Sequence, residues 1–160
     1  MQNKKNMLLW IAIVLLVVAF LLFITIKKSK TSDQEGVGQN NMENIQQVDG
    51  VKITVLQQGT GDTAKTGDRV SMNYTGSLED GSLFDSNVDP KFNHVEPFTF
   101  TLGEGQVIQG WDIGVEGMKV GEKRKLEINS EFAYGERGAG EAIPPNTKLI
   151  FEVELVEIIK

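Results

Sequence analysis

The segment that reads GQVIQGWDIGVEGM constrains the fold more than any other part of the chain. Its Trp111, Val115 and Met118 are spaced by four and then three residues, which gives a short helix one apolar face. Gly110 and Gly114 lie within the same helix, and each costs about 1 kcal/mol of helix propensity relative to alanine. Such a helix depends on tertiary packing, and its glycines let another surface approach closely. Trp111 is then either a core side chain or the floor of a ligand pocket.

Composition limits the classes of function that remain open. The 160 residues suit one globular domain with an additional segment, and the absence of cysteine excludes disulfides, thiolate zinc sites and cysteine nucleophiles. The single histidine, His94, excludes a metal site built from several histidines. Residues 48–160 carry 11 basic and 19 acidic side chains, and a domain this acidic repels phosphate backbones. We therefore expect no nucleic-acid partner.

Residues 7–26 form an uncharged apolar run, MLLWIAIVLLVVAFLLFITI. As a helix this run would span roughly 30 Å, the thickness of the hydrocarbon core of a bilayer. A cleaved signal peptide has a shorter apolar core followed by a small-residue cleavage site, whereas this run continues directly into two lysines. We expect an uncleaved transmembrane signal anchor that makes the protein a single-pass membrane protein.

The orientation and the domain organisation follow from the flanking residues. Lysines flank the apolar run on both sides, so the positive-inside rule gives no firm answer. The short N-terminal tail, residues 1–6, carries two lysines and favours a cytoplasmic N-terminus with the rest of the chain on the extracytoplasmic side. Residues 27–47 are rich in Asn, Gln and Ser, which predicts a flexible polar linker. Residues 48–160 form the globular domain.

Five segments of the globular domain alternate apolar and polar side chains with period 2, as half-buried strands do. They are residues 51–55, 70–74, 98–100, 125–129 and 151–155. Glycine-containing turn signals separate several of them, and one helical segment, around residues 106–117, interrupts the series. The pattern predicts an α+β domain in which an antiparallel sheet packs on one helix.

A series of short motifs in this domain resembles the FKBP-type peptidyl-prolyl isomerases, the macrolide-binding immunophilins. The resemblance covers essentially all of residues 48–160, and the motifs occur in the order that the family has. They are YTG at 74–76, LEDG at 78–81, FDS at 84–86, PFTFTLG at 97–103, VIQGW at 107–111, AYG at 133–135, IPP at 143–145 and LIFEVEL at 149–155. The resemblance implies a five-stranded, half-barrel-like antiparallel sheet wrapped around the short helix.

The resemblance also implies a site in which a proline ring enters the space between sheet and helix. The implied substrate-binding residues are Tyr74, Phe84, Phe98, Val107, Trp111, Ile143 and Phe151, with Trp111 as the floor. The Tyr134 hydroxyl would donate to a substrate carbonyl, the Ile108 N–H would be a second donor, and Asp85 would be the acid at the rim. From the residues alone, the aromatic side chains also suit core packing, and Asp85 also suits a turn cap before Ser86.

Two features concern the charged groups of the site. An arginine that often pairs with the pocket acid in this family has no clear counterpart, because Asn87, Val88 and Lys91 occupy that region. The segment after the FDS motif is also longer than in the smallest members, and it contains His94. Elsewhere, Glu127, Glu152, Glu154 and Glu157 raise the question of a metal, but acids at alternate strand positions are typical of a solvated face.

The resemblance implies an isomerase that accelerates rotation of X-Pro bonds in proteins and needs no cofactor or metal. Its implied partners are proline-containing polypeptides, with a macrolide as a further ligand, and its implied role is to assist the folding of membrane or exported proteins. Two other classes remain open from the sequence. One is a binding module that grips proline-containing segments without turnover, and the other is an interaction domain displayed from the membrane.

Overall fold

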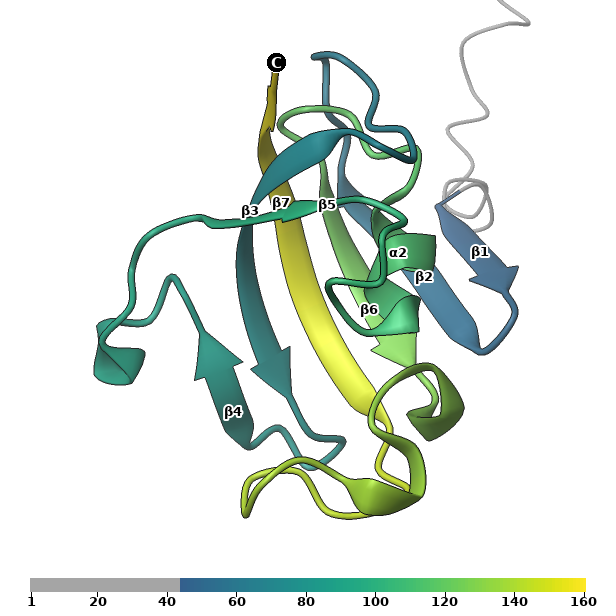
Figure 1. Cartoon of the computed structure of the whole chain (residues 1–160), viewed down its shortest axis with the longest axis vertical. Coiled ribbons are helices and arrows are strands. Elements are labelled where there is room, and N and C mark those ends of the chain that lie inside the picture. The colour runs from purple at the N-terminus through teal and green to yellow at the C-terminus, as the bar shows by residue number, and fades with distance from the viewer. Residues whose placement is uncertain (1–43) are drawn as a thin grey trace, which may run out of the picture. The chain divides into compact units, whose positions relative to one another are not determined.

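The strands of the computed structural model, which describes residues 44–160, form one antiparallel sheet. They are β1 (Ile45–Val48), β2 (Val51–Gln57), β3 (Arg69–Ser77), β4 (Leu83–Ser86), β5 (Phe98–Thr101), β6 (Lys123–Ile128) and β7 (Leu149–Ile159). Their order is β1-β2-β6-β7-β3-β4, and β5 also pairs with β3. In Figure 1, β7 runs through the middle of the sheet, whereas β1 and β4 lie at opposite edges.

The helix predicted around residues 106–117 is present as α2 (Gln109–Val115), which lies against β2 and β6 (Figure 1). Its predicted apolar face is confirmed, because Trp111, Val115 and Met118 are all buried. They pack into a core to which the inward side chains of β7 also belong, among them Phe151 and Val153. Three single turns of 3-10 helix complete the described part of the chain, η1 (Pro90–Phe92), η2 (Ser130–Phe132) and η3 (Gly135–Arg137).

The glycines of α2 are needed because the helix backbone lies directly on side chains of β6. A Cβ atom on Gly114 would lie 2.6 Å from Leu126 Cδ1, and one on Gly110 would overlap the side chain of Ile128. Both β6 side chains are fully buried. Glycine at these two positions lowers helix propensity, but it is required for α2 to pack this closely against the sheet.

A buried ion pair holds the C-terminal end of this short helix. The Arg124 guanidinium on β6 donates through one Nη to the carbonyl oxygens of Gly114 (2.8 Å) and Glu116 (3.1 Å), which are among the carbonyls that a helix end leaves without partners. Its Nε donates to Glu122 Oε1 at 2.6 Å. The cation lies at the negative end of the helix dipole, and the carboxylate compensates its charge.

Within residues 44–160, the sheet has seven strands where the sequence predicted five. The five predicted segments are all present, as β2, β3, β5, β6 and β7. The two additional strands lack an alternating pattern. β1 reads IQQV and is exposed throughout, so its pairing with β2 supplies the order that its side chains do not. β4 has only four residues and pairs with β3 alone.

The boundary of the ordered fold also differs from the prediction. β1 begins at Ile45, inside the segment predicted as linker, and joins β2 through Asp49-Gly50, a pair of residues typical of hairpin turns. The predicted N-terminal tail, signal anchor and most of the predicted linker, residues 1–43, lie outside the described residues. Within residues 44–160, no helix is long and apolar enough to cross a bilayer.

Gly114→Ala should lower the free energy of unfolding by about 1 kcal/mol. The gain in helix propensity is about 1 kcal/mol, and overpacking against Leu126 costs about 1–3 kcal/mol. Urea unfolding of a fragment that begins at Asn44 measures the change. Leu126→Val makes room for the added methyl group, so the double variant should be more stable than the sum of the two single changes predicts. Strict additivity would show that the helix does not contact the sheet at this point.

Candidate functional site

A pocket of about 270 Å³ lies between α2 and the strands that curve over it. We call it the indole pocket. Its lining residues are Tyr74, Phe84, Asp85, Phe98, Gln106, Val107, Ile108, Trp111, Tyr134 and Phe151. The structure thus brings together nine of the ten predicted site residues from β3, β4, β5, β7, α2 and the loops beside them.

Trp111 lies at the base of the indole pocket and is 4% exposed. The rings of Tyr74 and Phe151 meet it nearly edge-on, each with its centroid 5.3 Å from that of the indole. This is the arrangement that aromatic pairs favour. Within residues 44–160, the buried indole Nε1 has no hydrogen-bond partner. The base of the pocket is therefore an apolar aromatic surface.

Asp85 faces the indole pocket from β4. The Tyr74 hydroxyl donates to Asp85 Oδ2 at 2.7 Å, and His94 Nε2 lies 3.0 Å from Asp85 Oδ1. Both carboxylate oxygens are thus engaged with side chains at the pocket, which favours the pocket role of Asp85 over a turn cap. Burial and, to a smaller extent, the hydrogen bond to Asp85 raise the pKa of Tyr74 above its ordinary value. Its hydroxyl therefore stays a donor at neutral pH.

The two predicted donors lie at other parts of the pocket wall. Tyr134 precedes η3 and is 41% exposed. Burial and then the nearby charge of Asp85 raise its pKa above the ordinary value, so the phenol is protonated at neutral pH. Ile108 is the N-cap of α2, and its N–H therefore lies outside the hydrogen-bond ladder of the helix.

Ile143 differs from its predicted place. It does not line the indole pocket but is 5% exposed within the core. Its backbone pairs with Ala139, whose N–H donates to the Ile143 carbonyl at 2.8 Å. Ile143 thus closes the loop that follows Tyr134, and any effect that it has on a ligand acts through the position of that loop.

Sequence reasoning missed three residues around the pocket. Gln106 lines it, and its Oε1 accepts from the Thr101 N–H at 3.0 Å, which fixes its side chain. His94 contacts Asp85, the acid for which the family resemblance implies an arginine partner. Asn87 is buried and bonds to the backbone of β3. For Asn87 and His94 the available signal was the concentration of polar side chains in the segment between the FDS and PFTFTLG motifs, whereas Gln106 lies outside that segment and had no such signal.

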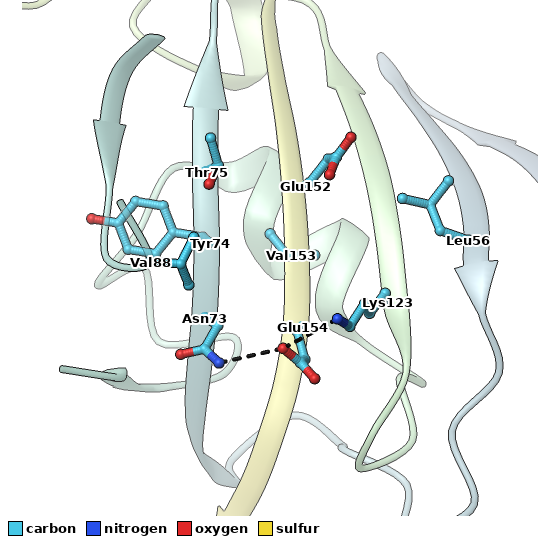
Figure 2. A pocket seen from close by; sticks show the side chains of 9 residues that line it. All are labelled: Leu56, Asn73, Tyr74, Thr75, Val88, Lys123, Glu152, Val153 and Glu154. Atoms are coloured by element: carbon cyan, nitrogen blue, oxygen red, sulfur yellow. Dashed lines mark hydrogen bonds and ion pairs between the residues drawn. The ribbon is translucent and has the colours of Figure 1, made fainter. Parts of the chain in front are cut away.

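A second hollow, of about 250 Å³, lies on the outer side of the sheet (Figure 2). Because Phe151 and Val153 of β7 face the core, the alternate residues Glu152 and Glu154 face outward. Glu154 accepts from Asn73 Nδ2 at 3.3 Å and pairs with Lys123 Nζ at 3.7 Å, as the dashed lines in Figure 2 show. The Glu154 carboxylate thus already has two partners, and the indole pocket, which is lined mainly by aromatic and aliphatic side chains, is the better candidate for an apolar ligand.

A further acidic side chain of the sheet, that of Glu127, also pairs with lysines. Glu127 lies 2.8 Å from Lys52 Nζ and 3.8 Å from Lys125 Nζ, and the hydrogen bond from Lys52 lowers the pKa of the Glu127 carboxyl. Within the part of the chain that the structure describes, no three histidine or acidic side chains are arranged to hold a metal ion.

The sheet curves over one short helix and leaves an aromatic pocket above Trp111, and this is the arrangement that the motif resemblance to the FKBP-type isomerases implies. Comparison with known proteins agrees. The model of the FKBP-type peptidyl-prolyl cis-trans isomerase family matches residues 61–156. The chain belongs to this family and is a peptidyl-prolyl cis-trans isomerase.

Two relatives and a solved structure are similar over about two thirds or more of the chain. An FK506-binding protein of Neisseria meningitidis serogroup A is 54% identical, over 66% of this chain and 94% of that protein. FK506-binding protein 1 of Dictyostelium discoideum is 50% identical, over 67% of this chain and 96% of that protein. The crystal structure of a peptidyl-prolyl cis-trans isomerase from Pseudomonas syringae pv. tomato has a TM-score of 0.63 and 36% identity, over 73% of this chain and 82% of that one.

Trp111→Leu should weaken binding of a proline-containing peptide about tenfold while the protein stays folded. Leucine keeps the base of the pocket apolar but removes most of the ring surface that a ligand buries, which is a loss on the order of 1–2 kcal/mol. Peptide titration by calorimetry measures the affinity, and circular dichroism checks the fold. An unchanged affinity in the folded variant would mean that the proline does not bind above this ring.

Proposed function

We propose that the indole pocket accelerates X-Pro rotation by binding the twisted imide more tightly than either planar isomer. The uncatalysed barrier is about 18–20 kcal/mol because amide resonance is lost at the midpoint of the rotation. A site needs no proton transfer and no covalent intermediate to lower it, only stronger interactions with the twisted form. The single observation that carries this proposal is the apolar aromatic lining of the indole pocket around Trp111.

The indole pocket favours the twisted form by removing water from the imide. Hydrogen bonding by water stabilises the charge-separated planar form, and an aromatic wall offers the carbonyl no such partner. The proline ring is held against the indole while the preceding residue turns. Partial loss of resonance is thereby less costly inside the pocket than in solution.

Three groups at the wall of the pocket position the substrate. The Tyr134 hydroxyl and the Ile108 N–H donate to carbonyls on either side of the rotating bond, which fixes the flanking chain without selecting one isomer. Asp85 supplies a carboxylate at the rim, and Tyr74 orients it by donating at 2.7 Å. These roles rest on the placement of the three groups around one cavity.

The physiological setting that we propose combines this domain with a membrane anchor. Residues 7–26 form the span, residues 27–44 tether the domain on the extracytoplasmic side, and the substrates are membrane or exported proteins during folding. The uncharged apolar run and the following polar segment support this arrangement. The pocket also suits a macrolide of the FK506 type, because two of the similar proteins carry the name FK506-binding protein.

The mechanism predicts that turnover of an uncharged peptide is nearly flat between about pH 6 and 8 and insensitive to chelators. Both pocket phenols have raised pKa values and stay protonated in this range.

Tyr134→Phe should cost about 1–2 kcal/mol of transition-state stabilisation at most, since one hydrogen bond is lost. Asp85→Asn should lower the rate by well under the 10²–10⁴-fold that is typical of a lost general acid or base. Exchange NMR of a Leu-Pro peptide measures these rates.

Two outcomes would contradict the mechanism. A bell-shaped profile centred near pH 7 on the uncharged peptide would show that proton transfer takes part. Saturable binding of the peptide without acceleration would favour a module that grips proline segments. The same spectra report binding and exchange, so these two failures are distinguishable.

The anchor predicts that the mature protein keeps residues 7–26. N-terminal sequencing of protein extracted from membranes should give a start at or near Met1, and a start beyond Ile26 would contradict the anchor. Protease added to intact cells should release the domain by cutting in the linker. Release that requires lysis of the cells would reverse the proposed orientation.

A further inference from the structure

The side chain of Asn87 ties the loop between β4 and β5, residues 87–97, to β3 and joins the two ends of the loop to each other. The buried Asn87 side chain accepts from the Tyr74 N–H at 2.7 Å and donates to the Met72 carbonyl at 2.9 Å. The same amide nitrogen donates to the Glu96 carbonyl at 3.0 Å. One amide thus holds the two ends of the loop, and the residues between them are positioned beside the pocket.

His94 lies in this loop, and each of its ring nitrogens faces an acceptor. Nδ1 lies 2.8 Å from the Phe92 carbonyl oxygen, and Nε2 lies 3.0 Å from Asp85 Oδ1. The Tyr74 hydroxyl oxygen, which donates its own proton to Asp85, is 3.5 Å from the same Nε2. The surroundings of the ring therefore offer acceptors on both sides.

A neutral imidazole carries one N–H and can satisfy only one of these acceptors, whereas an imidazolium donates from both nitrogens. The arrangement around His94 therefore fits the protonated ring. When the ring loses a proton, a nitrogen lone pair must face either the Phe92 carbonyl or the Asp85 carboxylate. One of the two contacts then opens, and Asp85 loses the charge that compensates its own.

The other charged groups nearby do not replace this compensation. Asp85 approaches His94 from β4, and the Tyr74 hydroxyl approaches from β3. Tyr134, across the pocket, is a neutral phenol near neutral pH. Within the loop, Lys91 pairs with Asp89 at 3.6 Å and lies over the ring of Phe92, while Glu96 adds a negative charge two residues from His94.

We propose that His94 is a specificity-determining residue that makes the substrate preference of the indole pocket depend on pH. Its imidazolium neutralises Asp85 and fixes the loop at the pocket rim. After deprotonation, Asp85 is an uncompensated anion at the rim and favours substrates with a basic residue before proline over those with an acidic one. The inference rests on the proposed function, since it requires that the X-Pro segment binds in this pocket.

The expected size of the effect follows from the exposure of the pair. The Asp85 side chain is 39% exposed and that of His94 is 49% exposed, so water screens their charges substantially. One unit charge acting on another across roughly 7 Å of mostly aqueous surroundings changes an equilibrium by a small factor. We expect the ratio of kcat/KM for a Lys-Pro peptide to that for a Glu-Pro peptide to be about two- to fivefold higher when the ring is neutral than when it is protonated.

The test compares Lys-Pro, Glu-Pro and Leu-Pro peptides on the full chain at low salt, by exchange NMR. His94 is the only histidine of the protein, so one imidazole ¹³Cε1 signal reports its charge in the same samples. The midpoint of this signal should coincide with the midpoint of the Lys-Pro to Glu-Pro ratio. His94→Arg keeps a positive charge and should hold the ratio at its acidic value. His94→Gln carries no charge and should hold it at its basic value.

The outcomes separate the two proposals. Leu-Pro turnover with a ratio that stays constant across the pH range would overturn the role of His94 and leave the isomerase mechanism intact. A ratio that changes equally in His94→Gln would assign the effect to another group and would also overturn it. Absence of Leu-Pro turnover in the unaltered protein would contradict the proposed function itself.

Discussion

The contact between α2 and β6 is the constraint on which the rest of the domain depends. Gly110 and Gly114 remove the two Cβ atoms that would otherwise meet Ile128 and Leu126, so the helix lies directly on the sheet. A helix of seven residues with two glycines has little stability of its own, and packing has to supply the remainder. The buried Arg124 adds hydrogen bonds at its C-terminal end. The sheet thus determines where the helix lies.

This constraint also builds the site. With α2 fixed on β6, the indole of Trp111 contacts side chains of β3 and β7, where Tyr74 and Phe151 meet it edge-on. Tyr74 in turn donates to Asp85, so the position of the rim carboxylate depends on the ring that packs against the base. The fold and the pocket share the same side chains, so the aromatic surface on which the proposed mechanism depends is fixed by the packing of the core.

Local patterns predicted the parts of this structure that depend on local sequence. The alternation in residues 151–155 identified β7, and the spacing of Trp111, Val115 and Met118 identified α2 and its buried face. β1 could not be predicted in this way, because its four exposed residues are ordered by pairing with β2 and not by a buried face. The motifs named ten site residues, and nine of them line one cavity, whereas Ile143 lies in the core. The contact between Asp85 and His94 could not be predicted, because no local sequence pattern connects the two residues.

The measurement that tests the central claim most directly is the response of the Trp111 indole N–H to a proline-containing peptide. A fragment of residues 44–160 contains one tryptophan, so its ¹H–¹⁵N spectrum has one indole signal. Because the indole ring lines the pocket and its N–H has no partner in the described part of the chain, a bound proline ring should shift the N–H signal strongly. We predict a saturable shift whose concentration dependence matches inhibition of turnover by the same peptide. An unmoved indole signal, with shifts confined to Asn73 and Glu154 on the outer face, would contradict the account.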